Sequence, residues 1–220
     1  AEHALMQLLA GAKRVLRADR AVREKERWNW RDRLEQTEIS GKRLLIIGFG
    51  RTGRQLARMV RAFDMEVRAY DPYLERTGWP EGPAHPARDL REALAWADYI
   101  SVHVPKGDKP VLGAAEFAIM KPGVVIANTA RGGVACERSL AAALRSRQVA
   151  AAGIAVFDVE PPDGGSPLID CDNALLSPHV AGLTDEASER MALASIRNAV
   201  DYLDRSIDPD LIVNRNVAHV

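Results

Sequence analysis

Three side chains with complementary chemistry stand in the second half of the chain: Arg131, Glu160 and His179. An arginine can hold a carboxylate through two parallel hydrogen bonds, and a histidine can pass a proton to or from an oxygen near neutral pH. A glutamate beside the histidine would orient the ring and favour its charged form. Together these residue types predict a site that binds a small carboxylic acid and moves a proton.

Each of the three also has a structural interpretation. A histidine at a strand end is more often structural than catalytic, and an arginine often forms a salt bridge. Glu160 stands before Pro161 and Pro162, where a glutamate is often a solvated turn residue. The case for a site therefore depends on the elements that position these residues.

A glycine-rich segment, Gly48-Phe49-Gly50-Arg51-Thr52-Gly53, directly follows an apolar run and opens a helical pattern. In that context the glycines permit a tight turn, close approach of the backbone to a diphosphate, and close packing of helix on strand. Asp71 stands 21 residues beyond Gly50, at the end of the next predicted strand. Its carboxylate would accept hydrogen bonds from ribose hydroxyls and repel a 2′-phosphate, which predicts NAD rather than NADP. The alternative is a structural glycine turn followed by an unrelated aspartate.

The hydrophobic pattern alternates strands with helices from residue 42 onward. Strands are predicted near 43–47, 66–70, 99–103, 124–127, 151–156 and 174–176, and helices near 53–63, 88–97, 114–120, 137–147 and 184–205. Residues 2–27 are predicted to form one amphipathic helix whose charged second half faces solvent. The pattern indicates an α/β fold of Rossmann type, with a doubly wound, mainly parallel, six-stranded sheet. Ligands of such sheets bind outside the carboxyl ends of the strands, where Arg131, Glu160 and His179 stand.

Composition bounds the class of protein. The 220 residues include 30 acidic and 30 basic side chains, with 47% apolar residues, which is typical of a globular domain rather than a disordered chain. Zero net charge gives no overall field to recruit nucleic acid or an anionic membrane surface. Two cysteines provide neither a disulfide framework nor a metal-ligand cluster, and neither a signal peptide nor a membrane span is evident. We therefore expect a cytoplasmic protein without nucleic-acid, membrane or metal partners.

Three blocks of sequence resemble the signature blocks of the NAD-dependent D-isomer-specific 2-hydroxyacid dehydrogenases. They are Asn128-Thr129-Ala130-Arg131-Gly132-Gly133, Val156-Phe157-Asp158-Val159-Glu160-Pro161 and Ser177-Pro178-His179-Val180-Ala181-Gly182, and the segments at 1–5, 103–105 and 120–123 are also similar. The resemblance implies that Arg131 binds the substrate carboxylate and polarises its carbonyl, that His179 is the acid/base, and that Glu160 is its partner. The cofactor-binding residues that we assign from the glycine pattern and the resemblance together are Gly48, Gly50, Arg51, Thr52, Gly53, Asp71, His103, Val104, Pro105, Thr129, Ala130 and Ala155.

The resemblance also implies NAD as cofactor, a small 2-oxo or 2-hydroxy acid as substrate, and a homodimer. Residues 1–205 would form the dinucleotide-binding domain, and residues 206–220 would return to a substrate domain whose other part precedes this chain. Ala155 departs from the family, which usually carries an Asp there that meets the nicotinamide carboxamide. Two alternatives stay open: a non-catalytic NAD-sensing or corepressor-like module on the same fold, and a relative of formate dehydrogenase. Intact Arg131, Glu160 and His179 argue against the first alternative, and Glu160 in place of an expected Gln argues against the second.

Overall fold

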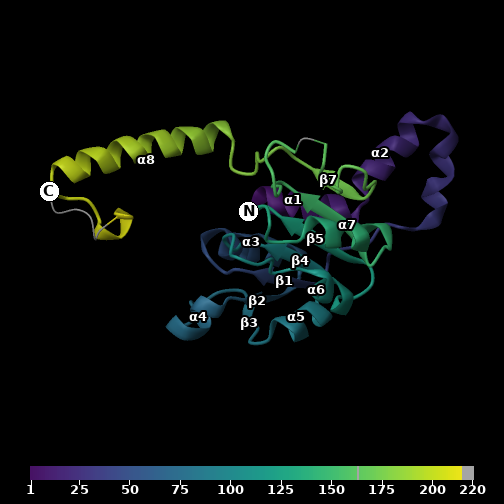
Figure 1. The fold of residues 1–220 in the computed structure, drawn as a ribbon, viewed down its shortest axis with the longest axis horizontal. Helices are drawn as coiled ribbons and strands as arrows, with labels where there is room; N and C mark the ends of the chain where they lie inside the picture. The colour runs from purple at the N-terminus through teal and green to yellow at the C-terminus, as the bar shows by residue number, and fades with distance from the viewer. Residues whose placement is uncertain (163, 215–220) are drawn as a thin grey trace. The chain divides into compact units, whose positions relative to one another are not determined.

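The computed structural model describes residues 1–162 and 164–214, with the side chains of 25–27 left aside, and its centre is a parallel sheet (Figure 1). The sheet has the order β3-β2-β1-β4-β5-β6-β7. Its strands are β1 (Arg43–Ile47), β2 (Glu66–Tyr70), β3 (His85–Pro86), β4 (Tyr99–Val102), β5 (Val124–Asn128), β6 (Val149–Ile154) and β7 (Ala174–Leu176). The six predicted strands are confirmed. The seventh, β3, was missed because two residues ending in a proline carry no strand pattern and pair only with β2 at the edge.

Helices cover both faces of the sheet. The helices of the chain are α1 (Glu2–Ala12), α2 (Val15–Arg23), α3 (Arg51–Val60), α4 (Pro72–Thr77), α5 (Leu90–Trp96), α6 (Ala114–Ile119) and α7 (Glu137–Arg145) in the unit that holds the sheet, and α8 (Asp185–Leu203) in a second unit, with 3-10 turns at Lys25–Arg33, Arg61–Phe63 and Pro209–Leu211. Strand β1 shows how the layers form, because alternate residues point to opposite faces. Leu44 and Ile46 pack with α1 and α3, whereas Leu45 and Ile47 pack with α5, α6 and α7. The predicted doubly wound α/β architecture is confirmed.

The prediction of one helix over residues 2–27 is wrong. Helix α1 ends at Ala12, and Arg14 takes a left-handed conformation with φ of 50° before α2 begins. Ala4, Leu8 and Ala12 of α1 are buried against the sheet at β5 and β6, and the arginine-rich continuation cannot follow that apolar surface. The chain therefore turns away and later returns, where the N–H of Thr37 donates to the carbonyl of Ala12.

The sheet reverses its winding between β1 and β4, which are neighbours although β2 and β3 lie between them in sequence. Doubly wound sheets bind ligands at this point, at the carboxyl ends of the strands. Gly48 ends β1 here with φ of +92°, and a Cβ on Gly48 would lie 2.7 Å from the carbonyl oxygen of His103 after β4. Only a glycine at position 48 therefore permits the two strand ends to lie this close together.

The chain divides into two compact units, Ala1–Ala181 and the residues from Gly182 onward. The first unit holds the whole sheet, and the second holds α8, whose first turn is capped by Thr184 accepting from the N–H of Ala187. The predicted domain boundary after residue 205 stays a prediction, and residues 215–220 of the predicted C-terminal segment lie outside the described residues. In the described part of the chain, no helix is both long and apolar enough to cross a membrane.

The polar side chain of Gln7 in α1 is buried at a cost in stability. The amide of Gln7 is fully buried against Gly153 of β6, and neither its nitrogen nor its oxygen has a partner among the described residues. Gln7→Met should raise the free energy of unfolding by about 1 kcal/mol in urea denaturation, because an unpaired buried amide is removed at similar volume. The control is Gln148→Met, which should destabilise because the Gln148 amide donates to the carbonyls of Phe117 and Met120. Equal destabilisation by both variants would contradict this account of Gln7.

Candidate active site

The glycine segment after β1 forms a cradle at the beginning of α3. A Cβ on Gly53 would lie 2.4 Å from the carbonyl oxygen of Gly48, so the helix packs directly on the strand end. Gly50 is the N-cap of α3 and offers no side chain to its N–H groups, and a Cβ built there would meet nothing within 4 Å. The uncapped N–H groups of a helix attract anions. The residues present therefore fit the diphosphate of a dinucleotide.

Asp71 lies at the end of β2, beside this cradle. One carboxylate oxygen accepts from the N–H of Phe49 at 2.9 Å, and the other accepts from the N–H groups of Tyr73 and Leu74, which begin α4. A carboxylate offers about four acceptor positions, so one remains for a further donor such as a ribose hydroxyl. The cap on α4 fixes the carboxylate where the sequence predicts the ribose contact.

A cleft of about 360 Å³ follows the cradle along the strand ends. It brings together half of the predicted cofactor contacts, and its lining consists of Thr52, His103, Val104, Pro105, Lys106, Thr129, Ala130 and Arg131. The hydroxyl of Thr129 is buried without a hydrogen-bond partner among the described residues. Because a buried hydroxyl is costly to leave unpaired, it fits a ligand with a polar group in the cleft. Lys106 belongs to this lining but was not among the predicted site residues.

His103 contributes an uncharged wall to the cleft. Its Nε2 shares a hydrogen bond of 2.8 Å with the hydroxyl of Ser101, and its backbone N–H donates to Ile47. Burial lowers the pKa of His103 to about 4. The ring is therefore neutral near pH 7 and cannot serve as a proton donor there.

Glu160 and His179 form a close pair after β6 and β7. The Nδ1–H of His179 donates to one carboxylate oxygen of Glu160 at 2.6 Å, and the N–H of Phe157 donates to the other at 2.9 Å. The hydrogen bond from His179, assisted by that from Phe157 and by the charge of Arg131, lowers the pKa of Glu160. Glu160 is therefore held as a carboxylate, and it lies within electrostatic reach of both His179 and Arg131.

The loop that carries Arg131 is braced from within. Asn128 at the end of β5 is buried; its side-chain oxygen accepts from the N–H of Ala130, and its amide donates to the carbonyl of Arg131. A Cβ on Gly132 would lie 1.8 Å from the carbonyl oxygen of Phe157, so this loop touches the segment that leads to Glu160. The guanidinium of Arg131 stays exposed at the cleft, with one N–H bonded to Ala130.

His179 has an unusual backbone conformation. Its φ is +52°, in the left-handed region that non-glycine residues seldom adopt, and its N–H donates to the carbonyls of Ala155 and Ser177. The hydroxyl of Ser177 shares a hydrogen bond of 2.9 Å with Nε2 of His3 in α1. The segment around His3 resembles the family, but no role was predicted for His3. Its partner Ser177 is 174 residues away in the sequence, and no local pattern indicates the hydrogen bond between them.

A second buried brace comes from Glu137 at the beginning of α7. Its carboxylate accepts from the N–H of Asp158 at 2.7 Å and from the hydroxyl of Ser166 at 2.5 Å. These bonds hold both sides of the loop that contains Glu160. Glu137 was not predicted from the sequence, because a glutamate in the first turn of a helix ordinarily serves only to favour that helix end.

Ala155, just beyond β6, is fully buried and is not part of the cleft lining. Its backbone accepts from His179 and donates to the carbonyl of Asn128. Its assignment as a nicotinamide contact stays a prediction. No group of three or more His, Cys, Asp or Glu side chains in residues 1–162 and 164–214 is arranged to hold a metal ion.

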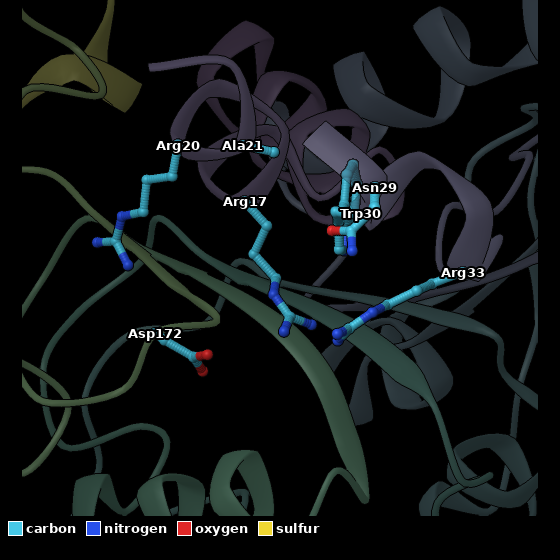
Figure 2. Close-up of a pocket in the computed structure, with 7 residues that line it drawn as sticks. All are labelled: Arg17, Arg20, Ala21, Asn29, Trp30, Arg33 and Asp172. Atoms are coloured by element: carbon cyan, nitrogen blue, oxygen red, sulfur yellow. The ribbon is translucent and has the colours of Figure 1, made fainter. Parts of the chain in front are cut away.

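Another cavity, of about 400 Å³, lies between the segment of α2 and its 3-10 turn and the residues before β7 (Figure 2). Arg17 and Arg33 extend into it, and both pair with Glu35. Asp172 lines the opposite wall, where it pairs with Arg147. None of the predicted site residues lies here, and the charged side chains on each wall pair within their own side of the cavity.

Comparisons with known proteins agree with this geometry. Residues 5–181 match the family model described as D-isomer specific 2-hydroxyacid dehydrogenase, NAD binding domain. The chain is 36% identical to D-3-phosphoglycerate dehydrogenase of Archaeoglobus fulgidus over 91% of its own length and 38% of that protein. It is 34% identical to glyoxylate reductase of Aeropyrum pernix, over all of this chain and 67% of that protein. The solved structure of Rhodotorula graminis D-mandelate dehydrogenase superposes with a TM-score of 0.80 at 27% identity, over 91% of this chain and 60% of that one.

The low pKa of His103 predicts a pH dependence of folding. The ordinary pKa of a histidine is 6.5 and that of folded His103 is about 4, so between these values the unfolded chain binds more protons. The stability contributed by the neutral ring is complete above pH 6.5 and is lost as pH falls towards 4, by up to roughly 3 kcal/mol. Urea denaturation at pH 7 and pH 4.5 should show a smaller loss in His103→Gln than in the parent chain. A ring that titrates near 6.5 by NMR would contradict the assignment.

Proposed function

Because the chain belongs to the D-isomer specific 2-hydroxyacid dehydrogenase family and carries its NAD binding domain, we propose that it serves an oxidoreductase acting on a D-2-hydroxy acid and its 2-oxo acid. The observation that carries the proposal is the hydrogen bond between Glu160 and His179, with Arg131 within electrostatic reach of Glu160. The chain spans 38% of the length of the Archaeoglobus relative, so the activity proposed is that of a whole protein containing this domain.

Each polar residue has a separate task in the proposed reaction. Arg131 holds the carboxylate of the 2-oxo acid and polarises its carbonyl. His179 is bonded to Glu160 through Nδ1, which leaves Nε2 to give a proton to the carbonyl oxygen. Glu160 keeps the ring in that orientation and stabilises its charged form. In the reverse direction Nε2 takes the proton from the hydroxyl group.

Bound NAD supplies the hydride chemistry, and the protein supplies position. The cradle of Gly48, Gly50 and Gly53 would hold the diphosphate, with Arg51 and Thr52 in the first turn of α3. Asp71 would accept from the ribose. The cleft residues from His103 to Pro105, with Thr129 and Ala130, would enclose the nicotinamide half.

Neither alternative is favoured by the comparisons, because the family model that matches is that of the D-isomer specific 2-hydroxyacid dehydrogenases. A binding module would also have no use for a bonded acid/base pair. Two further expectations accompany the proposal: assembly as a homodimer, which sedimentation of the whole protein would test, and a cytoplasmic location.

Preference for NAD over NADP is expected from Asp71. Calorimetric titration should give NAD at least about tenfold tighter binding than NADP, because a 2′-phosphate would meet a carboxylate. Asp71→Asn should narrow this difference while it retains an oxygen to cap α4. Equal affinities in the parent chain would show that Asp71 does not face the ribose.

Arg131→Lys tests the proposed reaction directly. In the whole protein with NADH and a 2-oxo acid, kcat/KM should fall by roughly a hundredfold, because a single ammonium cannot reproduce two parallel bonds to the carboxylate and carbonyl. Arg138→Lys on the exposed surface of α7 is the matched control and should leave the rate unchanged. Full activity in Arg131→Lys would remove Arg131 from the reaction.

Glu160→Gln should change the pH profile of the same reaction. Carbonyl reduction requires protonated His179, and the variant loses the carboxylate that stabilises the charged ring. The pH above which reduction fails should therefore move to a lower value. Asp158→Asn, in the same loop and exposed, should leave the limit where it is. An unmoved limit in Glu160→Gln would disconnect Glu160 from the acid/base.

A further inference from the structure

Lys106 is a second cation on the wall of the cleft. It follows Pro105 and lines the same cavity as Thr129 and Arg131. Its side chain is exposed, and among the residues that the structure describes it forms no ion pair. The glycine pattern, the polar strand-end residues and the family signature blocks all left it unassigned.

The charges around this cleft do not balance. Its lining holds Lys106 and Arg131 and no acidic side chain, and His103 in the same lining is neutral near pH 7. Arg131 lies within electrostatic reach of the Glu160 carboxylate, whereas Lys106 forms no ion pair among the described residues. The ammonium group of Lys106 is therefore available to pair with an anion in the cleft.

Gly133 provides the space that the Lys106 side chain occupies. A Cβ on Gly133 would lie 2.9 Å from Cε and 3.3 Å from Nζ of Lys106, and Gly133 has φ of +78°. A side chain at position 133 would thus displace the lysine. The ammonium group lies against the loop that carries Arg131, whereas a Cβ on Gly50, at the diphosphate cradle, would have no atom of Lys106 within 4 Å.

We propose that Lys106 and Arg131 bind the two ends of a substrate that carries a second anionic group besides its 2-oxo carboxylate. Arg131 takes the carboxylate next to the carbonyl, and Lys106 takes a carboxylate, phosphate or sulfonate at the far end of a short chain. This inference rests on the proposed function. Lys106 is then a specificity-determining residue. Its flexible ammonium group supplies a point charge without a fixed geometry, which is sufficient to bind an anion at the end of a short chain.

The experiment compares substrates of one and two negative groups in the whole protein with NADH. Pyruvate is the monoanionic probe, and oxaloacetate and 3-phosphohydroxypyruvate are the probes with a second anion. Lys106→Met keeps the length of the side chain and removes its charge. KM for the two doubly charged acids should rise by roughly tenfold, and KM for pyruvate should change by less than about twofold. Lys106→Arg should retain the preference of the parent protein.

Lys109→Met is the matched control, because Lys109 is exposed on the same segment but does not line the cleft. It should leave all three KM values unchanged. Fluorescence titration with NADH serves as a check of folding and should give the same Kd in every variant. Loss of NADH affinity in Lys106→Met, or an equal rise of KM for pyruvate, would overturn the role of Lys106. A parent protein that binds NADH and reduces none of the three acids would instead overturn the proposed function.

Discussion

The carbonyl oxygen of Phe157 stands where a side chain at position 132 would have to be, and the candidate site depends on this contact. Gly132 lets the loop after β5 touch the segment after β6 without a gap. On one side of the contact lies Arg131. On the other, the N–H of the same Phe157 bonds to Glu160, which in turn accepts from His179. A Cβ at position 132 would push the two loops apart and separate the cation from the carboxylate.

Hydrogen bonds from buried polar side chains fix the conformation of these loops, as backbone pairing fixes the strands of the sheet. Asn128 satisfies the backbone on both sides of Ala130, and Glu137 satisfies the backbone and hydroxyl groups on both sides of Glu160. Fully paired buried polar groups are rigid, because any displacement leaves a donor or acceptor unpaired in a poorly solvated place. The side chains of Arg131, Glu160 and His179 can therefore stay exposed while the backbone that carries them is fixed.

Local patterns were sufficient to predict most of the sheet and the order of the site residues. Apolar runs such as Arg43–Ile47 are long enough to define a strand, and the glycine spacing that follows, between a strand and a helix, is typical of a dinucleotide-binding turn. The break at Arg14 was not predictable in the same way, because helical periodicity continues through it and the sheet surface beneath α1 is set by distant residues. The contacts of His3 and Glu137 were missed for the same reason. Their partners are separated from them by many residues, and nothing in the local sequence names them.

The left-handed backbone of His179 bears on how the sequence at this position has been selected. A side chain in this region costs about 1 kcal/mol or more relative to glycine, which adopts it freely. A chain required only to fold and to hold a dinucleotide would gain stability by replacing His179 with glycine. A histidine at this strained position therefore indicates selection for a property other than stability. Across descendants of this sequence, the residue at 179 should change to glycine soon after proton transfer ceases to be useful.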